Sequence, residues 1–285
     1  MQVLIAGGTG FIGRALRVYL EGMNIDTKVL TRKASESYHV AWTPELKTCD
    51  ISQLRDVTHI INLTGEGIAD KRWTKQRKKV LISSRIETTI FLHSLAQKHC
   101  PKLIGYVGIS GVNAFGFGDE KIHQENEPFG ADFLSQLVKD WEEAHKAFDF
   151  LPVFSILRLG MVLSPDGGAY EKIAKPMRLG FGAIPGKGSQ WVPWVHLKDV
   201  VHVIHIGLTQ SQGLIHLVAE NSSMKELTEA IAQKEQRKIY LPNIPPFMIR
   251  LIFGEMGGLL TESVRISNEK LLSFYALKHP HLSTL

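Results

Sequence analysis

Short apolar runs alternate with amphipathic stretches along most of the chain. Residues 3–6 form a continuous apolar run that ends in glycine, which is typical of a buried parallel strand. Apolar side chains then recur at positions 12, 15, 16 and 20, a helical spacing, and Gly22 follows as a stop signal. The same patterns predict further strands at 27–30, 60–63, 103–109, 153–159 and 214–218. Further helices are predicted at 74–98, with a break near 82–85, and at 133–148, 197–208 and 224–232.

This alternation predicts one fold class. Strands separated by helical crossovers form a parallel sheet that helices cover on both faces, so we expect a Rossmann-type, doubly wound α/β fold. The composition changes after Gly160, because residues 167–194 are rich in Gly, Pro and Trp, as irregular lobes that close over a site often are. We expect a larger domain at 1–160, which also receives elements from about 197–220, and a smaller substrate-side lobe at 161–285. Residues 271–285 show little periodicity, so we expect them to be partly frayed.

Composition narrows the class of protein. The 285 residues are 44% hydrophobic and 21% charged, which is ordinary for a soluble globular protein. The two cysteines, Cys49 and Cys100, form no CxxC pair, so we expect neither disulfides nor structural zinc, and a reducing, cytoplasmic location is favoured. No apolar run approaches the roughly 20 residues of a membrane-spanning helix, and the N-terminus lacks the basic stretch of a signal peptide. We therefore expect no membrane partner.

The charge balance is mildly basic, with a formal net charge of +5. This charge is compatible with an anionic ligand. No recognition motif for nucleic acid accompanies it, so we expect no nucleic-acid partner. The densest basic run, at 71–79, has two interpretations. It is either the solvated face of a helix or a lip that attracts a phosphorylated substrate, and the sequence alone leaves both open.

The strongest motif is the glycine-rich turn GGTGFIG at residues 7–13, which follows the first strand and opens the first helix. Its first glycine permits a tight turn, the middle one lets the backbone approach a pyrophosphate, and the last lets the helix pack on the sheet. The helix N-terminus presents free N–H groups and the positive end of its dipole to phosphates. The motif therefore predicts a dinucleotide site, with contacts from Gly7, Thr9, Gly10, Phe11, Ile12 and Gly13.

The end of the second strand indicates which dinucleotide binds. NAD-binding proteins usually place an Asp or Glu there, about 20 residues beyond the glycines, to hold the ribose. This chain has Thr31, Arg32 and Lys33 instead. A guanidinium suits a 2′-phosphate, the Thr31 hydroxyl can donate a hydrogen bond, and Lys33 adds charge. We therefore expect NADP(H) as the cofactor; the plain alternative for Arg32 is an exposed arginine after a strand.

Several segments resemble one protein superfamily. They are GGTGFIG at 7–13, INLTGEGIADKRWT at 61–74, SRIETT at 84–89, DFLSQLVKDWEEA at 132–144, LRLGMVLSPDGGA at 157–169, MRLGFGAIPGKGSQWVPWVHLKDVV at 177–201 and FGEMGGLLTESVRIS at 253–267. Through them the chain resembles the extended short-chain dehydrogenase/reductases, also called the NAD-dependent epimerase/dehydratase family. Within that superfamily it looks like the atypical subgroup of epimerase family proteins. The resemblance covers nearly the whole chain.

The resemblance implies further cofactor contacts. Leu63 and Thr64 match the end of a strand where the family's backbone passes the adenosine and pyrophosphate. Arg85 matches a position that such proteins use toward the cofactor, and Val162 matches the region that meets the nicotinamide. The plain alternatives are a surface salt bridge for Arg85 and a core position for Val162. Members often pair through their long helices, here 74–98 and 133–148, so the resemblance also implies a homodimer.

The resemblance does not extend to the catalytic pair. Active members of the wider superfamily use a Ser or Thr together with a Tyr and a Lys in the pattern YxxxK, where the lysine lowers the tyrosine pKa so that the tyrosine can move a proton. Ser110 stands at the end of the strand predicted at 103–109, where it could bond a substrate carbonyl or hydroxyl, or simply cap a turn. The helix that should hold YxxxK starts with Phe133, which cannot move a proton. Lys139 follows it by six residues rather than four, so we expect Lys139 to point elsewhere.

Other residues have both a functional and a structural interpretation. Glu66 follows a strand where substrate would lie, Tyr170 lies in a glycine-flanked segment, and Trp191 and Trp194 could stack on a ring or a sugar. For each of them a loop or core position is favoured. Asp199 precedes an apolar run and is expected to be a helix cap or a first-turn acid. The scattered histidines show no metal-ligand spacing, so no metal is expected.

Two functional hypotheses stay open. The first is an NADP(H)-dependent oxidoreductase or isomerase that acts on a small substrate, with a nucleotide-linked molecule as one candidate. The second is a non-catalytic NADP(H)-binding regulatory or sensor protein. The glycine turn and a lobe able to build a pocket favour the first hypothesis. The missing YxxxK favours the second.

Overall fold

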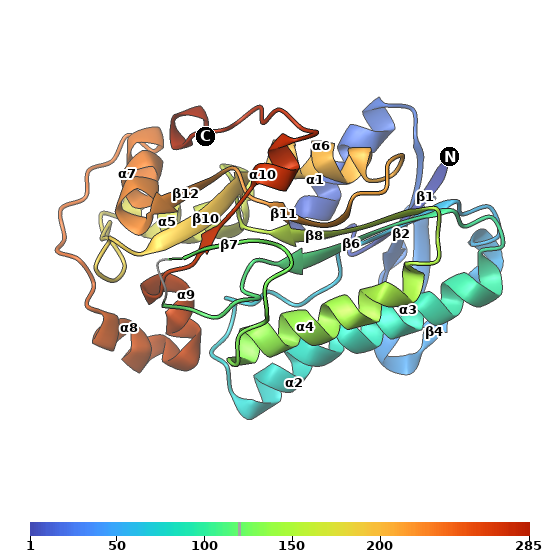
Figure 1. Cartoon of the computed structure of the whole chain (residues 1–285), viewed down its shortest axis with the longest axis horizontal. Helices are drawn as coiled ribbons and strands as arrows, with labels where there is room; N and C mark the ends of the chain where they lie inside the picture. Colours follow the sequence, from blue (N-terminus) through green and yellow to red (C-terminus); the bar gives the residue numbers. More distant parts are fainter. Residues whose placement is uncertain (119–120) are drawn as a thin grey trace.

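The computed structural model describes residues 1–118 and 121–285, and a large, mostly parallel sheet organises them (Figure 1). The strands of this sheet are β1 (Gln2–Ala6), β2 (Asp26–Thr31), β3 (His39–Thr43), β4 (Thr48–Cys49), β5 (His59–Asn62), β6 (Gly105–Gly111), β8 (Val153–Leu159) and β11 (Gly213–Leu217). Among the described residues their order is β11-β8-β6-β5-β1-β2-β3-β4, and neighbours are parallel except for β3 and β4. The direction of winding reverses between β1 and β5, where doubly wound sheets bind their ligands.

Helices cover both faces of this sheet (Figure 1). α1 (Phe11–Gly22) and α6 (Leu197–Ile206) lie on one face. α3 (Ile86–His99) and α4 (Phe133–His145) lie on the other, with α2 (Lys75–Ser83) leading into α3. The alternation of strands and helices in the sequence predicted a Rossmann-type, doubly wound α/β fold, and this fold class is confirmed.

Alternate side chains of β1 point to opposite faces of the sheet and belong to two different core clusters. Val3 and Ile5 are fully buried in the cluster that includes the apolar faces of α1 and α6. Leu4 and Ala6 point to the opposite side and join the cluster that includes α3. A sheet that is covered by helices on both faces needs strands that are apolar on both faces. The continuous apolar run of β1 predicted this arrangement.

The predicted elements of this half match the observed ones closely. The break expected near 82–85 is the link between α2 and α3 at Ser84 and Arg85. Polar side chains fix where the helices begin: Thr74 accepts a hydrogen bond from the N–H of Arg77 (3.1 Å), and Asp132 accepts one from the N–H of Leu134 (2.8 Å). The short strand β3, with Val40 and Trp42 buried, was not predicted.

The remaining elements gather at the end of the molecule to which the arrowheads of β6 and β8 point (Figure 1). They are β9 (Met161–Ser164), β10 (Trp191–His196), β12 (Glu220–Ser223), β7 (Ile122–His123), β13 (Arg265–Ile266), α5 (Gly168–Arg178), α7 (Met224–Lys234), α8 (Pro246–Phe253) and α9 (Gly258–Thr261). The last α-helix, α10 (Glu269–Leu272), instead packs against β11 of the main sheet. β12, β10 and β9 form a small sheet. Residues 167–194 contain α5 and the start of β10, so the irregular segment expected there is confined to 179–190. None of the described helices is long and apolar enough to cross a membrane.

The segment 271–285 is packed against the core, so the expectation of a frayed end is wrong. Leu271 and Tyr275 are buried. Asp199, fully buried in the first turn of α6, accepts hydrogen bonds from the Tyr275 hydroxyl (2.7 Å) and from the backbone N–H groups of Lys278 (2.8 Å) and His279 (3.0 Å). One buried carboxylate thus holds a segment that has no periodic signal of its own.

Candidate functional site

The glycine-rich turn between β1 and α1 is shaped by contacts that leave no room for side chains. Gly7 has a left-handed backbone (φ 80°), and a Cβ there would lie 2.6 Å from the carbonyl oxygen of Leu63. A Cβ on Gly13 would lie 2.5 Å from the carbonyl oxygen of Gly7. Gly10 is exposed, and the nearest atom to a Cβ there is 3.3 Å away. The turn is tight against the protein on its inner side and open on its outer side.

The N-terminus of α1 is open to an anion. Its N-cap is Gly10, which has no side chain to accept a helix N–H, and this described helix has no acid in its first turn. Thr9 is exposed, and its carbonyl oxygen accepts a hydrogen bond from Arg14 (2.8 Å) that fixes the turn. Phe11 and Ile12 begin the helix, half-buried. Free N–H groups and the positive end of the helix dipole are the features that bind a phosphate.

The end of β2 lies beside this turn because β1 and β2 pair in parallel. Thr31 is buried, and its hydroxyl accepts a hydrogen bond from the N–H of Lys33 (3.3 Å), which tightens the bend. Arg32 projects outward with 66% of its side chain exposed, 3.6 Å from the carboxylate of Glu45. An exposed pair at this distance contributes little stability, so a phosphate could compete for the guanidinium.

On the other side of β1, a buried polar network fixes Leu63 and Thr64. The side-chain oxygen of Asn62 accepts hydrogen bonds from the N–H (3.1 Å) and the hydroxyl (2.6 Å) of Thr64. The Asn62 amide donates to the Tyr106 hydroxyl (3.1 Å), which lies 2.6 Å from Nδ1 of His145. The backbone beside the glycine turn is therefore held by side chains from three elements.

His145 completes this network as a neutral imidazole. Its Nε2 lies 3.0 Å from the carbonyl oxygen of Ile109. A carbonyl can only accept, so Nε2 carries the proton and Nδ1 accepts from Tyr106. Burial lowers the pKa of His145 to about 4. None of the three residues Asn62, Tyr106 and His145 was a candidate from the sequence, because each looks like an ordinary strand or helix residue there.

Acidification is expected to destabilise the fold between about pH 6.5 and 4. Burial lowers the pKa of His145, His196 and His216 to about 4 each, below the value of about 6.5 in an unfolded chain. In this window the unfolded chain binds protons that the folded chain excludes, so stability falls as the pH falls. A pKa difference of one unit corresponds to about 1.4 kcal/mol, so the fully buried His145 alone contributes roughly 3 kcal/mol, and His196 and His216 add to the loss in the same direction. Urea unfolding at several pH values between about 7.5 and 4.5 measures the loss.

The control for this prediction is His145→Gln, which keeps a polar side chain but removes one titrating group. Its stability should fall about a third less steeply with pH than that of the unsubstituted chain. A free energy of unfolding that stays constant from about pH 7 to 4.5 would show that these histidines are not held neutral.

Two buried arginines hold the loop that follows Thr64. Arg85 donates hydrogen bonds to the carbonyl oxygens of Glu66 (3.0 Å) and Leu81 (3.2 Å). Arg77 pairs with the Glu66 carboxylate (3.1 Å). Burial and then the nearby Arg77 charge lower the pKa of Arg85 to about 10. Arg85 is thus buried rather than a surface salt bridge, and it sets the path of the loop; its contact with a cofactor stays a prediction.

The basic side chains of the run at 71–79 lie in different surroundings, and a role as a lip for a phosphorylated substrate stays a prediction. Arg77 turns inward, as described above, whereas Lys71, Lys75 and Lys79 are exposed. Lys78 pairs with Glu255, next to α8, and so ties α2 to the C-terminal part of the chain. The run is therefore not uniformly a solvated helix face.

Ser110 belongs to a buried ion-pair network. Its hydroxyl donates to the Glu142 carboxylate (2.7 Å), which also accepts two hydrogen bonds from the Arg158 guanidinium (2.7 and 2.8 Å). All three side chains are buried. Arg158 also donates to the carbonyl oxygen of Glu125 (3.0 Å). A serine whose proton is engaged in this way can still accept a hydrogen bond, so a catalytic role for Ser110 stays a prediction.

The start of α4 presents an apolar surface where the wider superfamily has its tyrosine. The Phe133 ring meets Trp73 edge-on at 5.5 Å and lies under Lys78 at 4.6 Å. Lys139 is exposed, as expected for a lysine that points away from the site. Val162 is half-buried in β9, paired with Val195 of β10, and its role at the nicotinamide stays a prediction.

Two of the residues with alternative interpretations are core residues, as predicted. Tyr170 is buried, and its hydroxyl donates to Glu235 (3.0 Å). Trp194 is fully buried, and its indole N–H donates to Ser222 (3.0 Å). Trp191 is half-buried in the same strand as Trp194. Tyr170 and Trp194 therefore have no exposed ring face for a sugar, and the Arg265 guanidinium lies over the Trp191 ring at 4.7 Å.

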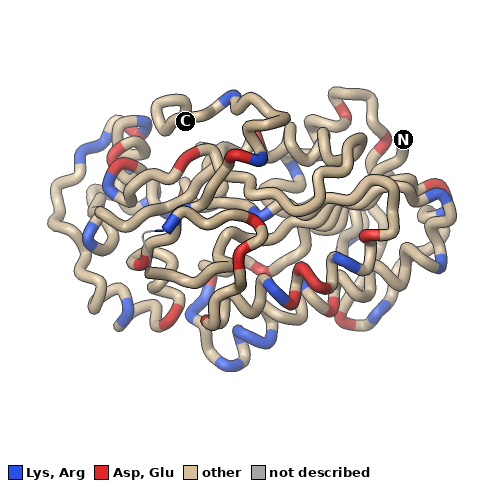
Figure 2. The backbone as a smooth tube through the Cα atoms, in the orientation of Figure 1, with Lys and Arg blue, Asp and Glu red and all other residues tan. Residues whose placement is uncertain are grey.

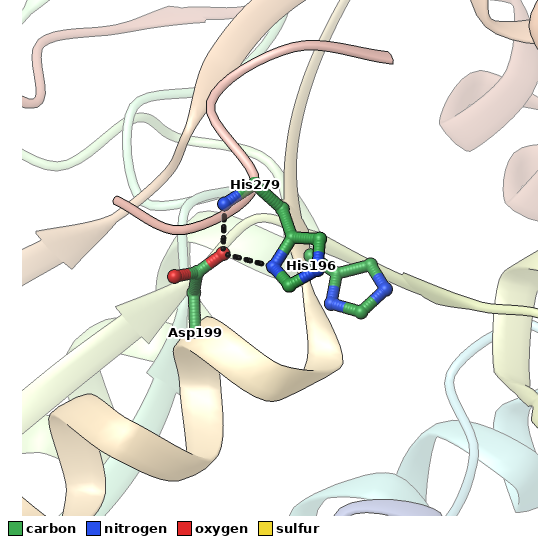
Figure 3. A group of neighbouring side chains, drawn as sticks. All are labelled: His196, Asp199 and His279. Carbon is green, nitrogen blue, oxygen red and sulfur yellow. Dashed lines mark hydrogen bonds and ion pairs between the residues drawn. The ribbon is translucent and has the colours of Figure 1, made fainter. Parts of the chain in front are cut away.

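One cluster has residue types that bind metals, although the sequence spacing gave no sign of it. The candidate ligand atoms of His196, Asp199 and His279 all lie within 4.8 Å of one another (Figure 3). Both oxygens of Asp199 already accept hydrogen bonds from the segment 275–279. The two imidazoles stack at 3.8 Å with only 17° between their planes, so their lone pairs cannot converge on one ion.

This cluster is better explained as a structural anchor. Asp199 lies in the first turn of α6, as predicted, while the N-cap is His196, whose Nδ1 accepts the N–H of Lys198 (3.1 Å). Figure 3 shows both the backbone N–H and the ring of His279 directed at the Asp199 carboxylate. The carboxylate therefore joins the start of α6 to the C-terminal segment.

Comparison with known proteins supports one assignment. Residues 3–218 match the model of the NAD dependent epimerase/dehydratase family. The chain is 30% identical over 294 residues to the mouse epimerase family protein SDR39U1, covering 99% of this chain and 97% of the mouse protein. It is 29% identical over 283 residues to the epimerase family protein SH2119 of Staphylococcus haemolyticus, covering 95% and 92%. The crystal structure of human epimerase family protein SDR39U1 (isoform2) with NADPH superposes with a TM-score of 0.89 at 29% identity, over 100% of this chain and 97% of that one.

Proposed function

The chain belongs to the NAD-dependent epimerase/dehydratase family, and we propose that it binds NADP(H) at the carboxyl edge of its main sheet. One observation carries the proposal: the uncapped N-terminus of α1 lies beside an exposed arginine, Arg32, at the end of β2. The first can hold a pyrophosphate and the second a 2′-phosphate. The similar human protein, whose crystal structure was solved with NADPH, supports the same cofactor.

The residues of the site fit this group. The outer side of Gly10 is open, and the helix N-terminus behind it offers N–H donors rather than carboxylates. In this proposal the cofactor contacts are the glycine turn (Gly7, Thr9, Gly10, Phe11, Ile12, Gly13), the β2 end (Thr31, Arg32), the β5 end (Leu63, Thr64), Arg85 and Val162. Bound NADP(H) would supply hydride transfer at its nicotinamide. The larger part, 1–160 with about 197–220, would hold the cofactor, and 161–285 would supply the substrate side.

We further propose an oxidoreductase or isomerase that acts on a small molecule. A second function, a non-catalytic NADP(H) sensor, is favoured by two observations. α4 begins with Phe133 and has no Tyr-x-x-x-Lys pair, and the Ser110 hydroxyl is engaged by Glu142. Oxidation of NADPH by a panel of carbonyl compounds and reduction of NADP by nucleotide sugars, both followed by the nicotinamide absorbance, together with NMR detection of isomerised product, separate the two functions. Turnover of any compound supports the enzyme.

Arg32→Ala is expected to weaken binding of NADPH by on the order of tenfold or more, because a charge-assisted hydrogen bond to the 2′-phosphate is lost. The affinity for NADH, which has no 2′-phosphate, should change little. Calorimetric titration of each variant with NADPH, NADP, NADH and NAD measures both effects.

The matched control is Arg55→Ala, an exposed arginine that precedes β5 at the opposite edge of the sheet. It should leave all four affinities unchanged, which excludes a general effect of lost positive charge. No binding of any dinucleotide would reject the cofactor proposal. Equal affinities for NADPH and NADH would reject the role of Arg32.

A further inference from the structure

α8 presents an apolar face that no described part of the chain covers. Of its side chains Ile249 is buried, whereas Phe247, Met248, Leu251 and Ile252 are exposed. Leu251 is the extreme case, with 76% of its surface accessible. A helix with exposed apolar residues at successive i, i+1, i+4 and i+5 positions has one continuous apolar side.

Two segments that pair with each other just before α8 also expose apolar side chains. Leu179 and Phe181 follow α5, Tyr240 and Leu241 follow α7, and all four are exposed. The segments run side by side, because the N–H of Gly186 donates to the carbonyl oxygen of Ile244 (2.9 Å) and the N–H of Ile244 to that of Ile184 (2.9 Å). The α8 surface is defined here by these exposed side chains: Leu179, Phe181, Tyr240, Leu241, Phe247, Met248, Leu251 and Ile252. Apolar patches of this kind usually mark an interaction site.

The unpaired charges of the segments that form the α8 surface are all positive, and the acidic residues that follow α8, Glu255 and Glu262, are each paired with a cation. Residues 179–190 and 236–253 contain Lys187, Arg237, Lys238 and Arg250 and no acidic residue. Arg250 pairs with Glu262 (2.5 Å), whereas the other three are exposed and form no ion pair with any described residue. In Figure 2 the trace from the end of α7 through α8 accordingly carries blue positions without red ones.

We propose that the α8 surface docks onto an anionic lipid surface, contrary to the expectation of no membrane partner, which rested on the lack of a membrane-spanning run. Exposed aromatic and aliphatic side chains flanked by unpaired cations are the pattern of helices that lie in a membrane interface. α8 also lies at the outer edge of the molecule, where it can reach a flat surface (Figure 1). A second copy of this chain is a poorer occupant, because a symmetric contact would bring three unpaired cations of one copy against those of the other.

Vesicle flotation of the purified full chain tests this proposal. The vesicles contain phosphatidylcholine alone or with about 30% phosphatidylglycerol, whose headgroup is anionic. The chain should bind the mixed vesicles at least about tenfold more strongly than the neutral ones, and less strongly at high salt. The variant F247E/L251E should lose at least about tenfold of this binding, because two charged side chains replace the two most exposed apolar ones of α8.

The matched control is V18E/L46E, which changes two apolar side chains that are 61% and 72% exposed but lie far from α8 in sequence. It should bind vesicles as the unsubstituted chain does, and circular dichroism shows whether each variant is folded. Three results would overturn the proposal: no flotation with either vesicle, equal flotation with neutral and anionic vesicles, or no flotation together with self-association that F247E/L251E abolishes. The last result would assign the surface to a second copy.

Discussion

Arg158→Met is expected to lower the free energy of unfolding by about 3–5 kcal/mol, the usual loss when one partner of a buried ion pair is removed. The side chain of Arg158 is 1% exposed and gives two hydrogen bonds to the Glu142 carboxylate. Without it, that carboxylate keeps the Ser110 hydroxyl as its remaining partner in the network described above. Chemical denaturation of both proteins measures the difference.

The double variant E142L/R158M separates the lost ion pair from general damage to the core. Replacing both partners by apolar side chains leaves no uncompensated charge, so at least half of the lost stability should return. If Arg158→Met changes stability by less than about 1 kcal/mol, the pair is not the buried, coupled unit that its geometry indicates.

Gly13→Ala is expected to weaken NADP(H) binding by about a hundredfold or more and to cost about 1–3 kcal/mol of stability, because the added methyl group meets backbone atoms. A Cβ there would lie 2.5 Å from both the carbonyl oxygen of Gly7 and the Cα of Gly8. The start of α1 must move away from the turn, and the N–H groups proposed to hold the pyrophosphate move with it. Calorimetric titration with NADPH and thermal unfolding measure the two effects.

Gly22→Ala is the matched control for this prediction. Gly22 ends the same helix, and nothing lies within 4 Å of a Cβ there. The substitution should leave NADPH binding unchanged and stabilise the helix by up to about 0.5–1 kcal/mol. Unchanged affinity in Gly13→Ala would show that the close approach of α1 to the turn is not needed for binding.

The sequence predicts the sheet and its cofactor edge well because both depend on local signals. An apolar run followed by glycines at 7–13 indicates a strand, a turn and a helix within one window, and the β2 end at Arg32 follows from it. The structure shows these pieces side by side through strand pairing. β3 was not predicted, because only Val40 and Trp42 of its five residues are buried. α5 was not predicted, because it contains Pro176 and proline disfavours a helix.

Local signals of this kind could not predict contacts between residues that are far apart in the sequence. The partners of Glu142 are 16 and 32 residues away, and no pattern in one window pairs them. One sign was present in the sequence: Glu142 falls between Val138 and His145 on the buried face of α4, where a charge needs a partner. The packed segment after residue 271 likewise depends on Asp199 and not on its own periodicity.

The anchoring of the C-terminal segment by Asp199 also sets an order of events during synthesis. Its partners Tyr275 and His279 lie 76 and 80 residues further along the chain. A ribosome that adds about 5–20 residues per second needs roughly 4–16 s to make that stretch. Until then the nascent carboxylate must stay hydrated, and a hydrated charge in the first turn of α6 cannot enter a dry core. We therefore expect α6 to pack against the sheet late, after α3 and α4 on the opposite face have already been translated.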